Sequence, residues 1–253
     1  MDSINGKLNR GDEHFRLLNQ EYSAWKEGAP WNLTPERSPD ARRFVLGIQF
    51  KSLPDFLRWG LILGEALYNY RCALDYMVYW LAQIQSGEDP PPGHQRLAFP
   101  ITSSDEAFQR SRNKLGELSI PVQTAIEELQ PYASDGDVAE HPLSRLRELN
   151  DQDKHRVLQV VAFSLQTAEF EFEGLESSEV LISINDQVLA ESDWLAAFTF
   201  PEPHLGPDLA ASMSVRLALV DEPVPRKAVL EVLSGIRQAV LNSVNILKEF
   251  ESN

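Results

Sequence analysis

The chain has almost no cysteine. Cys72 is the single thiol among 253 residues, which excludes an internal disulfide and any zinc site built from several cysteines. Cys72 lies in a strongly apolar stretch, where a lone thiol usually packs as a small core residue. We therefore interpret it as structural, with a reactive thiol as the alternative.

Long apolar runs are also missing. No stretch approaches the roughly 18 apolar residues that are needed to span a bilayer. Residues 1–10 are polar and lack the apolar core of a signal peptide. These absences predict a cytoplasmic protein that does not associate with a membrane.

Positive charge is scarce. The chain has 23 lysine and arginine residues against 38 aspartate and glutamate residues, which gives a net charge of −15. An acidic surface repels phosphate backbones, so a broad nucleic-acid-binding surface is excluded. A local basic pocket that holds one phosphate group is still compatible with this charge.

What the chain does contain is clear apolar periodicity. Apolar side chains recur every three or four residues over 15–25, which predicts a helix. Glycine and proline then break the pattern, and 29–40 is interpreted as a loop. Apolar side chains alternate over 44–50, which predicts a strand. Residues 54–83 are apolar nearly all round, which is typical of a helix at the centre of its domain.

Four polar residues interrupt this long apolar helix. They are Glu65, Asn69, Arg71 and Asp75. Because the burial of a charge without a partner is costly, each of them needs a partner or a function.

The remaining chain divides into a helical and a strand-rich part. Helices are predicted at 105–118, 120–129, 143–149 and 226–251, strands at 168–172, 180–184, 194–200 and 215–220, and loops at 86–94 and 131–141. Residues 157–163 fit either a strand or a helix. Strands that follow one another without intervening helices favour an antiparallel sheet. We therefore predict one α+β domain, with a helical part over about 1–165, a sheet over about 166–222 and a closing helix over about 226–251.

The first polar constellation lies on the long helix at 71–76. Arg71 and Asp75 are four residues apart and can form an ion pair on a helix, and Tyr76 follows directly. One interpretation is an arginine that grips a phosphate, with a polar neighbour for proton transfer. The other is a semi-buried ion pair that fixes helix packing.

The second constellation is a run of seven polar residues between two apolar segments. It consists of Asn150, Asp151, Gln152, Asp153, Lys154, His155 and Arg156. As a plain connector, Asn150 would close the preceding helix and an aspartate would cap the next element. In a functional interpretation Lys154 and Arg156 hold a phosphate, while His155 is the general acid or base and Asp153 orients its ring.

A metal site is a third interpretation of the same run. If the backbone is extended there, Asp151, Asp153 and His155 point to one side and offer oxygen and nitrogen ligands to a divalent cation. A helical backbone would separate them. The chain lacks a P-loop, a dinucleotide-binding glycine turn and a zinc-protease helix, so we predict no cofactor.

Part of the chain resembles a family of uncharacterised bacterial proteins. The resemblance rests on Leu63–Tyr76, which includes the helical sequences Gly-Glu-Ala-Leu and Arg-x-Ala-Leu-Asp, and on the Asp-Lys-His-Arg turn at 153–156. Phe99-Pro100-Ile101 and Leu129–Tyr132 appear in the same order. The resemblance covers roughly 10–165 and implies no established activity.

The long helix also resembles the signature helix of the HEPN superfamily. Many of those helical domains are ribonucleases of toxin–antitoxin, abortive-infection and CRISPR systems. Their motif is an arginine followed after four to six residues by a histidine, and a dimer cleaves RNA without a metal. Arg71 matches the arginine, but Tyr76 stands at the histidine position, and tyrosine is a poor general base near neutral pH.

Three functional hypotheses are open. The first is a non-catalytic binding or regulatory protein with a HEPN-like core, which the missing histidine and the acidic charge favour. The second is a metal-independent ribonuclease, of a toxin or phage-defence type, that uses Arg71 and His155. The third is a metal or small-molecule site at Asp151, Asp153 and His155. The resemblance and the apolar helix together imply a homodimer, and the local cations imply RNA or another phosphate-bearing ligand.

Overall fold

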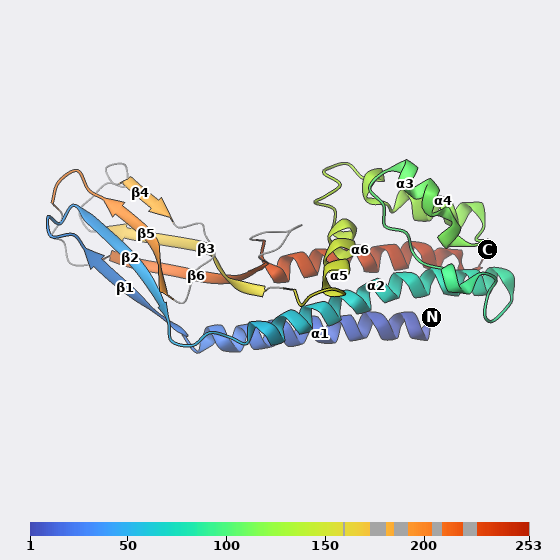
Figure 1. Cartoon of the computed structure of the whole chain (residues 1–253), viewed down its shortest axis with the longest axis horizontal. Helices are drawn as coiled ribbons and strands as arrows, with labels where there is room; N and C mark the ends of the chain where they lie inside the picture. The colour runs from blue at the N-terminus through green and yellow to red at the C-terminus, as the bar shows by residue number, and fades with distance from the viewer. Residues whose placement is uncertain (159, 173–180, 185–191, 204–208, 220–226, 253) are drawn as a thin grey trace.

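The computed structural model describes residues 1–158, 160–172, 181–184, 192–203, 209–219 and 227–252. The molecule is elongated, with the strands at one end and the helices at the other (Figure 1). Its helices are α1 (Asp2–Glu27), α2 (Phe56–Ser86), α3 (Asp105–Ser111), α4 (Ile120–Glu128), α5 (Pro142–Asp153) and α6 (Val229–Lys248), with short 3-10 helices η1 (His94–Arg96), η2 (Arg112–Leu115), η3 (Pro131–Ala133) and η5 (Glu249–Ser252). Its strands are β1 (Trp31–Arg37), β2 (Arg43–Phe50), β3 (Val160–Phe172), β4 (Leu181–Ile184), β5 (Ser192–Thr199) and β6 (Leu209–Leu219).

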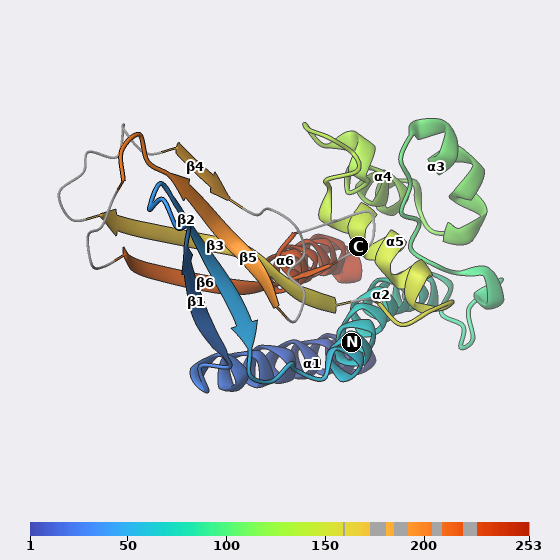
Figure 2. The same cartoon turned by 60° about the vertical axis from the view of Figure 1, so that its left-hand side comes forward.

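The strands form two antiparallel sheets. One has the order β1-β2-β5-β4, and the other pairs β3 with β6. Figure 2 shows the β3–β6 ribbon lying beside the four-stranded sheet at the same end of the molecule. Together with the helical end and the closing helix α6, these sheets confirm the predicted α+β fold.

The prediction of a loop over 29–40 is wrong for β1. Each residue from Trp31 to Arg37 pairs with a residue of β2, including Pro35 opposite Leu46. Because β1 is an edge strand, the missing N–H of Pro35 does no harm there. Trp31 and Leu33 alternate with polar Asn32 and Thr34 and pack against the core, but the prolines on either side favoured a loop, and the pairing with β2 is not visible in the sequence.

The predicted division of the chain at about residue 165 also needs correction. The β1–β2 hairpin leaves the helical end after α1, and β2 pairs with β5 far along the chain, with Arg43 opposite Thr199. Strand β3 begins at Val160, so residues 160–163 of the ambiguous segment are strand, while Val157 and Leu158 precede it. The sheet therefore draws residues from both predicted parts.

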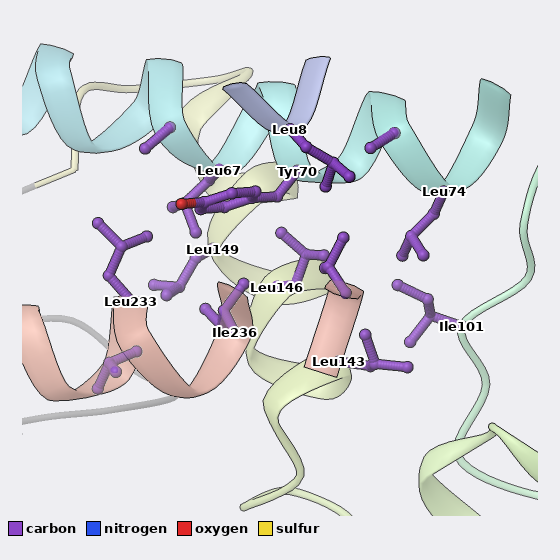
Figure 3. Packing of buried hydrophobic residues seen from close by; sticks show 14 of the residues in the cluster. Leu8, Leu67, Tyr70, Leu74, Ile101, Leu143, Leu146, Leu149, Leu233 and Ile236 are labelled. Atoms are coloured by element: carbon purple, nitrogen blue, oxygen red, sulfur yellow. The ribbon is translucent and has the colours of Figure 1, made fainter. Parts of the chain in front are cut away.

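The helical end is built around one apolar core. Side chains of α2, among them Leu67 and Tyr70, point toward Leu146 of α5 and Ile236 of α6 (Figure 3). All four side chains are fully buried. Burial of a large apolar side chain contributes roughly 1.5–3 kcal/mol, so this region holds α2, α5 and α6 together.

A polar cluster within this core ties three helices together. The Tyr70 hydroxyl of α2 donates to Asp12 of α1 at 2.8 Å, and Arg237 of α6 donates to both carboxylate oxygens of Asp12 at 2.7 Å. The Tyr70 ring lies against Gly11, where an added Cβ would come closer than 3.0 Å to the ring. The close contact requires glycine at that position.

Helix α2 begins and ends as its sequence dictates, but it is not buried all round. The Asp55 carboxylate caps its first turn by accepting from the N–H of Arg58, and Gly87 ends it in the left-handed conformation. Five of its large apolar side chains are exposed. They are Leu57, Leu61, Tyr68, Tyr76 and Ile84.

Candidate anion-binding pocket

Arg71 and Asp75 form the ion pair that their spacing predicts. Arg71 donates from Nη2 to Asp75 at 2.8 Å and from Nε at 3.2 Å. Phe99 joins both residues, because its carbonyl accepts from Arg71 at 2.7 Å and its N–H donates to Asp75 at 2.9 Å. The pair therefore anchors the segment after η1 to α2.

Two of the other polar residues of α2 also have plain structural explanations. Asn69 is buried, donates to the carbonyl of Glu65 at 2.8 Å and accepts from Lys7 at 3.3 Å. Glu65 itself is exposed and needs no partner.

The run from Asn150 to Arg156 is not the connector that the sequence suggests. Helix α5 continues through Asp153, so Asn150 does not close a helix, and the segment after Arg156 leads into β3 rather than into a helix that an aspartate could cap. This extension puts Arg147, Asn150, Asp151 and Lys154 at helical spacing, which brings them to one side of α5.

These residues meet Arg71 at a pocket of about 210 Å³. Its lining residues are Arg71, Phe99, Ile101, Lys114, Arg147, Asn150, Asp151 and Lys154. The two constellations that the sequence singled out thus contribute to one site. Four of the eight residues are cations, and they come from α2, η2, the middle of α5 and the residue that follows α5.

Each arginine of the pocket is held by the same short segment. Arg71 donates to the Phe99 carbonyl, and Arg147 donates to the Ile101 carbonyl at 3.2 Å and to Glu148 at 3.2 Å. Arginine side chains that are fixed in this way lose less conformational freedom when a ligand binds.

The two lysines differ in their surroundings. Lys154 pairs with Asp151 at 2.8 Å, and both side chains are more than half exposed. The exposed Lys114 side chain makes no hydrogen bond or ion pair with other described residues of the chain, although its backbone carbonyl accepts from the N–H of Ala98 at 3.0 Å and its charge opposes the effect of burial, which raises the pKa of Asp75. Lys114 is therefore a cation at the pocket that a ligand can engage without breaking an existing bond.

The electrostatics of the ion pair show competing effects. Burial raises the pKa of Asp75, while Arg71 and the Phe99 N–H act in the opposite direction. Burial prevails, and the pKa of the carboxyl lies above its ordinary value. The carboxylate thus depends on its pairing with Arg71.

Other residues proposed from the sequence lie outside this group of eight. Asp153 packs on α2, where its carboxylate would come closer than 3.0 Å to a Cβ added at Gly64. Burial, with a smaller effect of Glu65, raises the pKa of Asp153. His155 and Arg156 are exposed beyond the end of α5, and their N–H groups donate to the Gln152 carbonyl.

The proposed metal site loses its geometric basis. It required an extended backbone, but Asp151 and Asp153 lie within a helix and point in different directions. Asp151 pairs with Lys154 at the pocket, whereas Asp153 lies against Gly64. Within the described part of the chain, no group of three histidine, cysteine or acidic residues is placed to hold a metal ion.

Arg147 and Lys114 are the site residues that were not predicted from the sequence. Arg147 had a detectable signal, because it stands three, four and seven residues before Asn150, Asp151 and Lys154. Lys114 had none, since only the folding of the chain brings η2 to α2 and α5.

Family models, curated proteins and solved structures all gave no match. The likeness to HEPN domains and to the bacterial family remains a prediction. No helix in the described ranges has an apolar stretch long enough to cross a membrane.

Proposed function

We propose that this protein binds a small phosphate-bearing ligand in the pocket between α2, η2 and α5, as a binding or regulatory protein rather than as an enzyme. The observation that carries this proposal is the convergence of four cations on one pocket of a chain whose net charge is −15. On such a chain, cations gathered around a small hollow favour a local anion site.

The donor set suits phosphate in its geometry. Arg71 and Arg147 offer planar guanidinium groups that can each donate two parallel bonds, and Lys114 and Lys154 add mobile point charges. The buried amide of Asn150 provides a further donor. A pocket of about 210 Å³ lies below the usual range for whole drug-sized ligands, which favours one phosphate group.

Binding is preferred over RNA cleavage because of where the histidine lies. His155 was the residue predicted as acid or base, and it is exposed beyond α5 and is not among the eight lining residues. Tyr76, at the histidine position of the HEPN motif, lines a different pocket. A HEPN-like ancestry of the helical end is consistent with this proposal and forms part of it.

The direct test is calorimetric titration with inorganic phosphate and pyrophosphate. Lys114→Ala is expected to weaken binding about fivefold, as the loss of one hydrogen bond to a charged group does. Lys248→Ala is the matched control, because it removes the same charge from an exposed position at the end of α6. Absence of saturable binding, or equal losses in both variants, would contradict the proposal.

A further inference from the structure

A second pocket lies on α2, directly beyond the Arg71–Asp75 pair. It encloses about 410 Å³, and the side chains that matter here are those of Asp75, Tyr76, Tyr79, Trp80, Gln83 and Leu97. Five of these six come from successive turns of α2. We call this hollow the aromatic pocket and the one described above the cation pocket.

The two pockets share a boundary. Arg71 lines the cation pocket and Asp75 lines the aromatic pocket, and both residues bond to the backbone of Phe99. Arg71 and Tyr76 are separated by about 7.5 Å along the helix axis and by about 140° around it. A single ligand with an anionic end and an aromatic end reaches both pockets only by passing over the Arg71–Asp75 pair and the Phe99 backbone that joins it.

The aromatic pocket has the groups that bind a nucleobase. Tyr76, Tyr79 and Trp80 offer ring faces for stacking, which tolerates any base. The Asp75 carboxylate accepts hydrogen bonds from N–H groups, and the amide of Gln83 both donates and accepts. Oδ2 of Asp75 accepts one bond of 3.2 Å, from Arg71, so it retains capacity for a ligand donor.

We propose that the ligand is a free purine nucleotide, whose phosphate lies in the cation pocket and whose base lies in the aromatic pocket. This inference rests on the proposed function, because it assigns the phosphate to the same four cations. Guanine suits the carboxylate best, since it presents adjacent N–H donors on its Watson–Crick edge. A free nucleotide is favoured over RNA because the net charge of −15 repels a long phosphate backbone.

Titration of the protein with ribose 5-phosphate, guanosine 5′-monophosphate and guanosine distinguishes the nucleotide inference from the proposed phosphate-binding function. We expect the nucleotide to bind at least about tenfold more tightly than ribose 5-phosphate, because base stacking adds to phosphate binding. Equal affinities of the nucleotide and ribose 5-phosphate would overturn this inference and leave the proposed function intact. If neither phosphate compound binds, both proposals fail.

Two tyrosine variants provide a matched pair for the same titration. Tyr76 and Tyr68 are both exposed on α2, and Lys7 lies over both rings, but only Tyr76 is named at the aromatic pocket. Tyr76→Ala should weaken nucleotide binding about fivefold and leave ribose 5-phosphate binding unchanged. Tyr68→Ala should alter neither, and Tyr76→Phe should keep nucleotide binding.

A short oligoribonucleotide that begins with a phosphorylated guanosine distinguishes a free nucleotide from an RNA end. Weaker binding than guanosine 5′-monophosphate supports the free nucleotide, and tighter binding contradicts it. Equal effects of Tyr76→Ala and Tyr68→Ala on nucleotide affinity would also overturn the placement of the base. Thermal melting of each variant confirms that the fold is retained.

Discussion

The hydroxyl of Tyr70 donates to the carboxylate of Asp12 across the interface between α1 and α2, at 2.8 Å. Tyr70 is fully buried, and the loss of this bond would leave Asp12 with Arg237 as its remaining side-chain hydrogen-bond partner among the described residues. Tyr70→Phe should lower the free energy of unfolding by about 1.5–3 kcal/mol, as for a hydrogen bond to a charged group. Urea denaturation measures the change. Tyr68→Phe, at an exposed ring, is the control and should be neutral within about 0.5 kcal/mol.

The Asp12 carboxylate also makes the stability of the protein depend on pH. Burial alone raises the pKa of Asp12, but hydrogen bonds from Arg237 and Tyr70 outweigh it, and the pKa lies below its ordinary value. The stabilisation is therefore present above the ordinary pKa of about 4 and is lost as the pH falls through the lowered value. Between pH 5 and pH 2 the wild type should lose more stability than Asp12→Asn. Parallel acid dependence of the two proteins would show that Asp12 is not responsible.

Gly60 sets the distance between α2 and the chain that enters β3. A Cβ at this position would come closer than 3.0 Å to the carbonyl oxygen of Leu158 and to Cγ1 of Val157. Because a backbone carbonyl cannot turn aside cheaply, Gly60→Ala should destabilise the protein by about 1–3 kcal/mol. Gly6→Ala, where an added Cβ has open space, should instead stabilise α1 by about 0.5–1 kcal/mol. The melting temperatures of the two variants should move in opposite directions.

Asp151 is the carboxylate that competes with a ligand for Lys154. It accepts from Lys154 at 2.8 Å at the edge of the cation pocket. Asp151→Asn should therefore strengthen phosphate binding, by about threefold, since an exposed pair of this kind is weak. Glu249→Gln removes the same charge at the far end of α6 and should leave the affinity unchanged. A weaker affinity for Asp151→Asn would show that the carboxylate contacts the ligand directly.

The ribonuclease hypothesis and the binding proposal make opposite predictions for the role of His155 in RNA cleavage. Incubation of the purified protein with RNA in EDTA should give no cleavage that depends on His155, because this residue is exposed beyond α5. Cleavage by the wild type that disappears in His155→Ala would restore the hypothesis. Cleavage that persists in the variant would indicate a contaminating nuclease.

Much of the fold was predictable because local periodicity determined it. The spacing of apolar residues located α2, β2 and α6, each within a few residues of its observed ends. Strand β1 was missed because Pro30 and Pro35 outweighed the short alternation of Trp31 and Leu33, and its pairing with β2 lies outside the local sequence. The end of α5 was missed because polar residues at 150–153 look like a connector when no packing partner is visible.

About half of the candidate site could be predicted, because only some of its residues have a signal in the local sequence. Arg71 and Lys154 were identified as phosphate contacts, and both line the cation pocket. His155 was predicted as a general acid or base because charged residues flank it in the sequence. The helix ends at Asp153, however, and leaves His155 exposed. Lys114 reaches the pocket only through tertiary contacts, which no local pattern encodes.

The β1–β2 hairpin has a consequence for synthesis on the ribosome. Strand β2 pairs with β5, which is translated about 150 residues later. At usual rates of elongation, the hairpin waits on the order of ten seconds for that partner. During this interval the edge of β2 carries unpaired backbone groups beside Leu46 and Ile48, which are buried in the finished protein. Such an edge can pair with other chains, so the nascent protein is most exposed to misassembly before its last quarter emerges.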